Sequence, residues 1–396
     1  MNQSDSALNG IRVVAFELAV SGPFCSELLA DMGAEVIKIE RTKTGDTIRD
    51  WDDVVNGISS GYIWLNRNKR SLAIDVTSDD GRNVIHQLVK TADVFLENFA
   101  PGVADKLGFG YQKLRSINSN LIYCSLSGYG QDGPYKNRKA FDLLIQGEVG
   151  FMETTGSPDQ PAKVGPPVAD LAAGMYSALG IVMALYQRER IGRGQLIDIS
   201  MFDSLLSFMG YFPHHFWHRG EKPQRLGMRH SYITPYGPFL ARDKKYVSLA
   251  VASSRDWELF CKNVLRRLDL WENPVFETAE LRREHRVKLE TMIEEIFLKH
   301  DSAEWFERLK LAKLPYGEVL SIDQVLAHPQ VNFRNMIRNV SSPVGDVPVI
   351  ANPLKMTESP VRYDSIPDLG QDADMILTEL GYDKASIELL RANGIL

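Results

Sequence analysis

The stretch that decides the fold is RVVAFELAVSGPFCSELLADMGAEVIKIE, residues 12–40. It predicts a short apolar strand over 12–17, a helix over 23–33 that Gly33 closes, and a second apolar strand over 34–40. A strand, a helix and a strand in so short a span are typical of two parallel strands joined by a crossover helix.

The same alternation continues along the chain. Strands are expected over 71–76, 93–99 and 121–130, with helices over 79–92 and from residue 104. A last strand and helix occupy 194–212. The pattern predicts an α/β protein whose parallel sheet is covered by helices, with ligands at the carboxyl ends of the strands. Residues 217–237 are polar and rich in turns, and a second, smaller unit follows them.

Composition places the chain among ordinary globular proteins. The 396 residues are 44% hydrophobic and 24% charged, with a formal net charge of -6. This balance provides no basic surface for nucleic acid and no basic amphipathic segment for an anionic membrane. The polar N-terminus lacks the pattern of a signal peptide, and three widely spaced cysteines form no CxxC motif. We therefore expect a cytoplasmic protein.

Three local patterns are typical of binding sites, and each also has a structural explanation. Gly22 follows the first strand, but a dinucleotide-binding turn needs three glycines, so a plain turn is favoured. His214 and His218 are one helical turn apart without an evident third ligand, which favours packing over metal binding; the role of His215 between them stays open. The glycine-rich loop 127–135 is typical of backbone cradles for phosphate or carboxylate.

A single carboxylate, Asp170, precedes sixteen uncharged residues, Leu171 to Tyr186. The run is shorter than the ~20 residues that span a bilayer, so a buried core helix starting at Leu171 is expected. As its N-cap, Asp170 would satisfy a free N–H and be held ionised by the helix. The same carboxylate is placed to attack an activated acyl group, and the two roles are compatible. A stripe of small residues would let another backbone approach this helix: Ala173, Ser177, Gly180 and Ala184.

Several ordered segments together resemble the family III CoA-transferases, the formyl-CoA and carnitine CoA-transferase group. Besides residues 12–40 they are LNRNKRSLAIDV (65–76), ADVFLENFAPGVADKLGFGYQKL (92–114), SLSGYGQDGPY (125–135), PPVADLAAGMYSALGIVMAL (166–185) and ERIGRGQLIDISMFDSLLSFM (189–209). The resemblance covers residues 9–250 and resumes at 322–336. It implies a Rossmann-like large domain from residues 1–200 and 325–396, and a linker with a smaller α/β domain over 201–324. Two such chains would interlock as a homodimer.

The resemblance also implies a mechanism in which Asp170 is the nucleophile. Asp170 would attack an acyl-CoA thioester to form a mixed anhydride and CoA thiolate. The thiolate would then form an aspartyl-CoA thioester, which the acceptor carboxylate attacks in turn. The partners are an acyl-CoA and a small carboxylic acid. No permanent cofactor or metal is implied, because the CoA thioester is itself a substrate.

Contacts to CoA carry over from the family by position. They fall on Arg41, Ile74, Asn98, Phe99, Lys106, Leu107 and Lys139. The chain departs from formyl-CoA transferases at Thr77, where they have lysine, and at Val20, where they have glutamine near the substrate. It also lacks their GGGG-type loop. These departures argue against formyl-CoA and oxalate as substrates.

Residues 51–75 look closest to members that act on C4–C6 dicarboxylates such as succinate, itaconate, mesaconate, citramalate, malate or glutarate. A second carboxylate on the substrate needs a cationic or N–H partner. The candidates for substrate binding are Val20, Arg67, Arg70, Arg229 and His230.

Two other functions stay open from the sequence. The 2-methylacyl-CoA racemases of the same superfamily exchange an α-proton with a His in a GHD motif. Here that segment reads KAFD, and Phe141 cannot shuttle a proton. A CoA-binding protein without activity is the other alternative, although it would be expected to lack the Asp170 nucleophile.

Overall fold

The computed structural model describes residues 6–396, which divide into two compact units. The large unit contains the chain up to Val149, Val164–Gly210 and Pro329–Leu396. The small unit contains Gly150–Lys163 and Tyr211–His328. The sequence predicted boundaries at 200 and 325, so Gly150–Lys163 and the ten residues after 200 are the segments placed differently.

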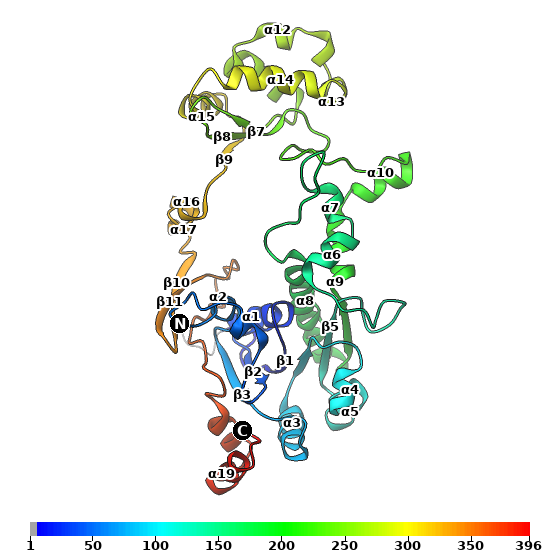
Figure 1. The fold of residues 1–396 in the computed structure, drawn as a ribbon, viewed down its shortest axis with the longest axis vertical. Helices are drawn as coiled ribbons and strands as arrows, with labels where there is room; N and C mark the ends of the chain where they lie inside the picture. Colours follow the sequence, from blue (N-terminus) through cyan, green and yellow to red (C-terminus); the bar gives the residue numbers. More distant parts are fainter. Residues whose placement is uncertain (1–5) are drawn as a thin grey trace. The chain divides into compact units, whose positions relative to one another are not determined.

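The large unit is built on a parallel sheet of six strands with the order β3-β2-β1-β4-β5-β6 (Figure 1). The strands are β1 Arg12–Phe16, β2 Glu35–Glu40, β3 Lys69–Ala73, β4 Val94–Glu97, β5 Ile122–Ser127 and β6 Leu196–Ser200. Consecutive residues of β1 alternate between two cores, with Val14 and Phe16 in one and Val13 and Ala15 in the other. Helices therefore cover both faces of the sheet, and the predicted α/β fold is confirmed.

Helices of the large unit sort onto these two faces. One core is closed by α1 Ser21–Asp31 and α8 Val168–Ile191. The other is closed by α3 Asp79–Thr91, α5 Tyr111–Ile117, α18 Ala373–Glu379 and α19 Lys384–Ala392. The C-terminal segment thus completes a core that the N-terminal strands begin. The remaining elements are α2 Ser60–Leu65, α4 Val103–Leu107, α6 Asp142–Glu148, α9 Met201–Leu206, α17 Pro329–Phe333, β10 Ile337–Ser342, β11 Gly345–Ile350 and short turns at Thr47–Asp50 and Ser207–Met209.

The small unit has a three-stranded antiparallel sheet with the order β7-β8-β9. Its strands are β7 Tyr236–Leu240, β8 Tyr246–Ala250 and β9 Tyr316–Glu318. A separate core of buried aliphatic and aromatic side chains, including Trp257 and Trp305, packs this sheet against several helices of the unit. The helices and turns of the small unit are α7 Phe151–Thr154, α10 Phe212–Arg219, α11 Ser254–Leu259, a π-helix Phe260–Leu265, α12 Leu268–Trp271, a turn at Pro274–Phe276, α13 Ala279–Glu284, α14 Arg286–Phe297, α15 Ser302–Leu311 and α16 Ile322–Leu326.

Helix α8 differs from its prediction in length and burial. It begins at Val168 and has 24 residues, which is long and apolar enough to cross a membrane by length and composition. Half of its most apolar window is buried, as in a core helix. It is not apolar and buried on all sides, because an apolar stripe at helical spacing is exposed. That stripe consists of Met175, Leu179, Val182, Met183 and Tyr186.

Candidate active site

The carboxyl ends of β1 and β4 form the point at which the sheet reverses its strand order. β1 pairs with β2 on one side and with β4 on the other, and all three strands are parallel. Ligands of open α/β sheets bind in the crevice that opens at such a position. The loop after β1, Glu17–Val20, and the residues after β4 meet here.

Asn98 joins these two loops. Its Oδ1 accepts the Leu18 N–H at 2.9 Å, and its Nδ2 donates to the Leu18 carbonyl at 2.8 Å and the Ser21 hydroxyl at 3.4 Å. Gly22 allows this close fit, because a Cβ there would lie 3.0 Å from Asn98 Cγ and from Glu17 Cβ. Asn98, predicted to line the CoA channel, therefore also fixes the loop from which α1 begins.

Helix α8 brings Asp170 to the same place. A Cβ on Gly174 would lie 2.8 Å from the Ser21 carbonyl oxygen, so the backbones of α1 and α8 cross at this glycine. Asp170 lies one turn earlier, and the side chain and backbone of Ser21 act to lower the pKa of its carboxyl group. The predicted stripe of small residues is largely buried, but the close approach occurs at Gly174, which lies beside it.

Asp170 is not the N-cap of its helix, and this corrects the sequence prediction. It is the third residue of α8, in a first turn whose N-cap position is Pro167. The free N–H of Ala169 donates instead to Asp142 Oδ1 at 2.8 Å, from the first turn of α6. Gln146 donates to the other oxygen of Asp142 at 2.8 Å. Asp142 thus serves as the cap, and Asp170 is left without that role.

The environment of Asp170 favours its neutral form. Burial, followed by the charge of Asp142, raises the pKa of Asp170 to about 7, while the hydrogen bonds from Ser21 act in the opposite direction. The prediction that the helix holds this carboxylate ionised was wrong, because burial and Asp142 raise its pKa. A carboxylate with a pKa near neutrality is more basic than an ordinary aspartate and remains available at physiological pH.

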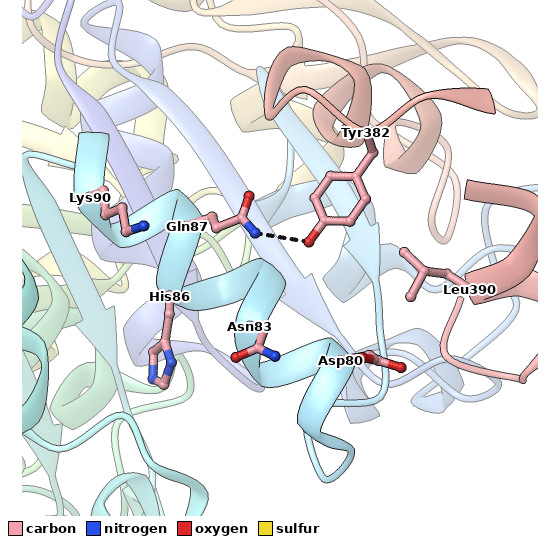
Figure 2. Close-up of a pocket in the computed structure, with 7 residues that line it drawn as sticks. All are labelled: Asp80, Asn83, His86, Gln87, Lys90, Tyr382 and Leu390. Carbon is pink, nitrogen blue, oxygen red and sulfur yellow. Dashed lines mark hydrogen bonds between the residues drawn. The ribbon is translucent and has the colours of Figure 1, made fainter. Parts of the chain in front are cut away.

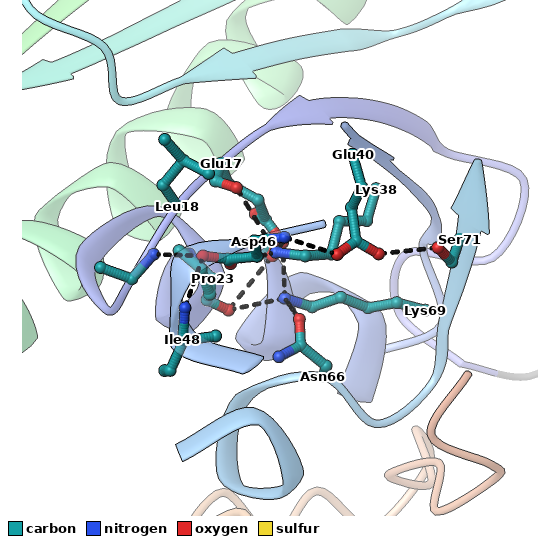
Figure 3. Close-up of polar contacts among 12 residues, drawn as sticks. Glu17, Leu18, Pro23, Lys38, Glu40, Asp46, Ile48, Asn66, Lys69 and Ser71 are labelled. Atoms are coloured by element: carbon teal, nitrogen blue, oxygen red, sulfur yellow. Dashed lines mark hydrogen bonds and ion pairs between the residues drawn. The ribbon is translucent and has the colours of Figure 1, made fainter. Parts of the chain in front are cut away.

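A buried ionic cluster contacts the loop after β1 (Figure 3). Lys69 Nζ donates to Glu17 Oε1 at 2.7 Å, to the Pro23 carbonyl at 3.0 Å and to Asn66 Oδ1 at 3.2 Å. Lys38 Nζ lies 2.8 Å from Asp46 Oδ2 and 3.3 Å from Glu17 Oε1. All these carboxylate and ammonium groups are fully enclosed. We call Glu17, Lys38, Asp46 and Lys69 the loop clamp.

The predicted CoA-binding residues follow three strands of the sheet. Arg41 comes directly after β2 and is exposed, while Ile74 follows β3 and is buried in the core. Phe99 is half-buried next to Asn98, and its N–H donates to Glu97 at 2.9 Å. The others are Lys106, exposed on α4, Leu107, packed on the core, and Lys139, exposed in the loop before α6.

Two arginines predicted to bind substrate are occupied by structural contacts. Arg67 is buried and pairs with Asp31 at 2.6 Å and with Glu27. Arg70 lies near the start of the edge strand β3 and pairs with Glu35 and with Glu379 at 2.9 Å. Both guanidinium groups already have carboxylate partners, so we do not keep Arg67 and Arg70 as substrate residues.

The other candidates differ in what they offer. Val20 is buried at the N-cap position of α1, directly before Ser21. In the small unit Arg229 pairs with Glu294 at 2.7 Å and covers the Phe239 ring. His230 Nδ1 accepts the N–H groups of Tyr232 and Ile233 at 3.1 Å each, which leaves Nε2 as the protonated nitrogen.

The histidines of α10 make aromatic contacts. The rings of His214 and His218 are parallel with centroids 6.0 Å apart, and His215 stacks on Tyr232 at 4.1 Å. Within residues 6–396 there is no group of three or more His, Cys, Asp or Glu side chains placed to hold a metal ion. The packing interpretation of this segment rests on these aromatic contacts.

One cavity of about 300 Å³ lies between α3 and the C-terminal helices (Figure 2). Gln87 donates to the Tyr382 hydroxyl across it at 3.1 Å. The lining contains none of the residues predicted to bind CoA or substrate; it consists of Asp80, Asn83, His86, Gln87, Lys90, Tyr382 and Leu390.

Comparisons with known proteins agree with the arrangement at the switch point. Residues 8–373 match the model of CoA-transferase family III. The chain belongs to this family. It is 35% identical to a succinate–glutarate CoA-transferase of Agrobacterium fabrum, over 94% of this chain and 95% of the relative. It is also 35% identical to a succinyl-CoA:mesaconate CoA-transferase of Haloarcula marismortui, over 95% of this chain and 97% of the relative.

A solved structure shows the same fold. A CaiB/BaiF family protein from Brucella suis superposes with a TM-score of 0.84 at 33% identity, covering 95% of this chain and 99% of that one. The protein is thus a CoA-transferase family member with the Rossmann-like strand order. The predicted family and enzyme class are confirmed.

Sequence reasoning missed two residues of the site, Asp142 and Ser21. Asp142 stands next to Phe141 in the segment KAFD, and an acidic residue is a typical helix cap. The sequence does not show that the helix it caps is α8. Ser21 carried no signal of its own, because its role depends on where α1 crosses α8.

Proposed function

We propose that the enzyme moves CoA from succinyl-CoA, or a similar C4–C6 dicarboxylyl-CoA, to a carboxylic acid acceptor, with Asp170 as nucleophile. One observation carries the proposal. The carboxylate of Asp170 lies at the switch point of the sheet with a pKa raised to about 7, and Asp142 performs the helix capping that would otherwise occupy it.

The chemistry conserves one activated acyl bond throughout. The Asp170 carboxylate attacks the thioester carbon, and the C–S bond breaks to give a mixed anhydride and CoA thiolate. The thiolate attacks the aspartyl carbonyl and releases the first acid, leaving an aspartyl-CoA thioester. The acceptor carboxylate then reverses these steps, with each leaving group serving as the next nucleophile. Backbone N–H groups at the start of α8 and α1 are the proposed oxyanion donors.

The dicarboxylate class rests on two supports. Both relatives quoted above are named for transfer between dicarboxylic acids. In the small unit, His230 has a ring N–H of the kind that binds a carboxylate, and burial lowers its pKa so that the neutral ring is favoured. Val20 is proposed as an apolar wall beside the acyl group, while Arg229 and His230 stay predicted substrate residues on the chemistry of their side chains alone.

Domain roles and assembly are part of the same proposal. The large unit is the CoA-binding catalytic domain, with Arg41, Ile74, Asn98, Phe99, Lys106, Leu107 and Lys139 along the CoA path. The exposed apolar stripe on α8 supports a homodimer, because a face of this composition is favourably covered by protein. We also propose a cytoplasmic location.

A trapping experiment tests the function. Wild-type enzyme mixed with succinyl-CoA and quenched with hydroxylamine or borohydride should carry a modification on the peptide that contains Asp170, and Asp170→Asn should carry none. A panel of acceptors then defines the substrate class: glutarate, mesaconate, itaconate, malate, oxalate and acetate. Transfer to monocarboxylates or oxalate alone would contradict the dicarboxylate class.

The racemase alternative gives a different signal in the same assay. Phe141 is largely exposed at the N-cap position of α6 and offers no proton-transfer group. The sole histidine of the large unit, His86, lies on α3 and contacts the Gly108 carbonyl at 3.0 Å. Exchange of an α-proton of a branched acyl-CoA in deuterated water, without an adduct, would replace the transferase proposal by the racemase.

A further inference from the structure

Side chains from other segments contact three consecutive residues of the loop between β1 and α1. The Glu17 side chain is bound by Lys38 and Lys69, and the Leu18 backbone by Asn98 in both directions. The Ala19 N–H donates to Asp46 Oδ1 at 2.9 Å. Three consecutive residues of the loop are thus held by four side chains from other segments of the large unit: Lys38, Lys69, Asn98 and Asp46. A loop that only connected two elements would not need this degree of fixation.

Ala19 adopts a conformation that requires such an anchor. Its φ is +60°, in the left-handed region that costs a residue with a Cβ about 1 kcal/mol or more. Asp46 Oδ1 accepts both the Ala19 N–H and the Ile48 N–H, at 2.9 and 3.1 Å. The second oxygen of Asp46 lies on Lys38. The strained residue is therefore fixed by a carboxylate that is itself fixed.

The loop clamp is costly to assemble in the interior. Four charged side chains are removed from water, and Glu17 Oε2 is buried with no hydrogen-bond partner among the described residues. Buried ion pairs of this kind are often no more stable than apolar replacements of equal volume, so stability alone explains the cluster poorly. Its contacts end on the loop and on the first turn of α1, through the Pro23 carbonyl.

The loop leads directly to the reacting group. Val20 and Ser21 follow Ala19, and Ser21 lies against α8 one turn from Asp170, where a Cβ on Gly174 would be 2.8 Å from the Ser21 carbonyl oxygen. The polar groups of Ser21 act on the Asp170 carboxylate and lower its pKa. We propose that the loop clamp, and Asp46 in particular, is a positioning device that sets the orientation of Ser21 toward the Asp170 nucleophile, an inference that rests on the proposed function of Asp170. Asp46 touches no reacting atom, and it acts through Ala19 and Ser21.

The test compares the two ends of the same strand. At the start of β1, Asp93 performs the same task as Asp46: Oδ2 accepts the Arg12 N–H at 2.8 Å and Oδ1 pairs with Arg188 at 2.7 Å. Asp46→Ala should slow formation of the Asp170 adduct from succinyl-CoA at least tenfold, with the KM for succinyl-CoA changed less than twofold. Asp93→Ala should leave the rate of adduct formation within twofold of the wild type.

A conservative variant separates positioning from charge. Asp46→Asn keeps a carbonyl oxygen that can accept the Ala19 N–H but removes the charge facing Lys38. It should recover most of the rate lost in Asp46→Ala. If Asp46→Ala does not fold, Lys38→Met replaces it, because that variant keeps Asp46 but frees its second oxygen, and a loss of the same sign is expected.

Hydrogen exchange decides the inference independently of turnover. In unliganded enzyme, amides of residues 18–24 should exchange faster in Asp46→Ala than in wild type, and at the wild-type rate in Asp93→Ala. Unchanged exchange and an adduct rate equal to that of Asp93→Ala would overturn the inference. A wild type that forms no adduct would refute the proposed function instead, and exchange in residues 18–24 would still decide the positioning of the loop.

Discussion

Glu17 and Asp170 are two carboxylates at the same end of one sheet, the first buried and the second half-buried, and their surroundings shift their pKa values in opposite directions. Burial tends to raise the pKa of both groups. For Glu17 the charges of Lys69 and Lys38 outweigh burial and lower the pKa. For Asp170, none of the groups in residues 6–396 that shift its pKa is a cation, and the Asp142 carboxylate raises it further.

The difference separates a scaffold from a reagent. A carboxylate clasped by two ammonium groups is a poor nucleophile, because its charge is already used in two strong contacts. A carboxylate without a cationic partner keeps its basicity, and a more basic carboxylate is a better nucleophile. Four predictions test this contrast, beginning with the largest effect.

Replacing Asp170 by Asn should abolish turnover. The amide has nearly the same shape and can keep a contact to Ser21, so the fold should be preserved while the nucleophile is lost. We expect transfer to fall by more than a thousandfold, or about 4 kcal/mol in activation free energy. Steady-state assays with succinyl-CoA and glutarate measure the loss.

The matched control is Glu17→Gln, at the other carboxylate of the comparison. Because Glu17 belongs to the loop clamp, this variant should lose stability and form the adduct more slowly, but the adduct on Asp170 should still form. Residual transfer within tenfold of wild type in Asp170→Asn would show that the contrast between the two carboxylates has been misassigned.

Replacing Lys69 by Met should have the largest effect on stability. The change leaves Glu17 with Lys38 as its remaining cation and removes the 3.0 Å hydrogen bond to the Pro23 carbonyl, which then keeps the donor Ser26. Breaking one partner of a buried ion pair costs about 3–5 kcal/mol. Urea unfolding followed by circular dichroism would measure it.

An exposed cation of the same unit provides the control for that loss. Arg391 pairs with Asp374 and Glu388 on the surface of α19. Arg391→Met should change the unfolding midpoint far less than Lys69→Met. Equal losses would mean that the loop clamp is no more important to the fold than a surface pair.

The pH dependence of adduct formation should report the pKa of Asp170. Because burial and Asp142 raise this pKa to about 7, the carboxylate is protonated below that pH and cannot attack. Single-turnover rates should fall about tenfold per pH unit below 7 and level off above it. Rapid-quench mass spectrometry across pH 5–9 would give the profile.

Asp142→Asn should shift that profile toward lower pH. The variant removes the negative charge that raises the pKa of Asp170, while its carbonyl oxygen still accepts the Ala169 N–H. Gln146→Glu provides a converse change, since it places another acidic group against Asp142. A profile that stays in place or moves upward in Asp142→Asn would contradict the electrostatic explanation.

Prediction from sequence succeeded where a pattern is local. The apolar runs of β1, β2 and β4, and the helices between them, follow from composition over a few residues. The strand alternation then implies the parallel sheet. Asp170 stands before a long uncharged run, which makes it a candidate in the sequence alone, and its role as nucleophile stays a prediction.

The features that a local pattern does not show depend on contacts across the chain. Arg67 and Arg70 are cationic residues in a turn-rich segment, and nothing local reveals that Asp31 and Glu35 lie against them. The local pattern also does not show that Asp142 and not Asp170 caps α8, because the two residues lie 28 positions apart in the sequence. The exposed stripe of α8 was missed because its residues are as apolar as those of the buried face.

Arg70→Gln should have the smallest effect, and it tests the structural assignment of this arginine. The pairs with Glu35 and Glu379 lie partly open to solvent at the edge of the sheet, so their loss should cost about 1 kcal/mol of unfolding free energy. The KM values for glutarate and mesaconate should not change, because the guanidinium is held by Glu35 and Glu379. A tenfold rise in the KM for diacids, with acetate unaffected, would restore Arg70 as a substrate residue.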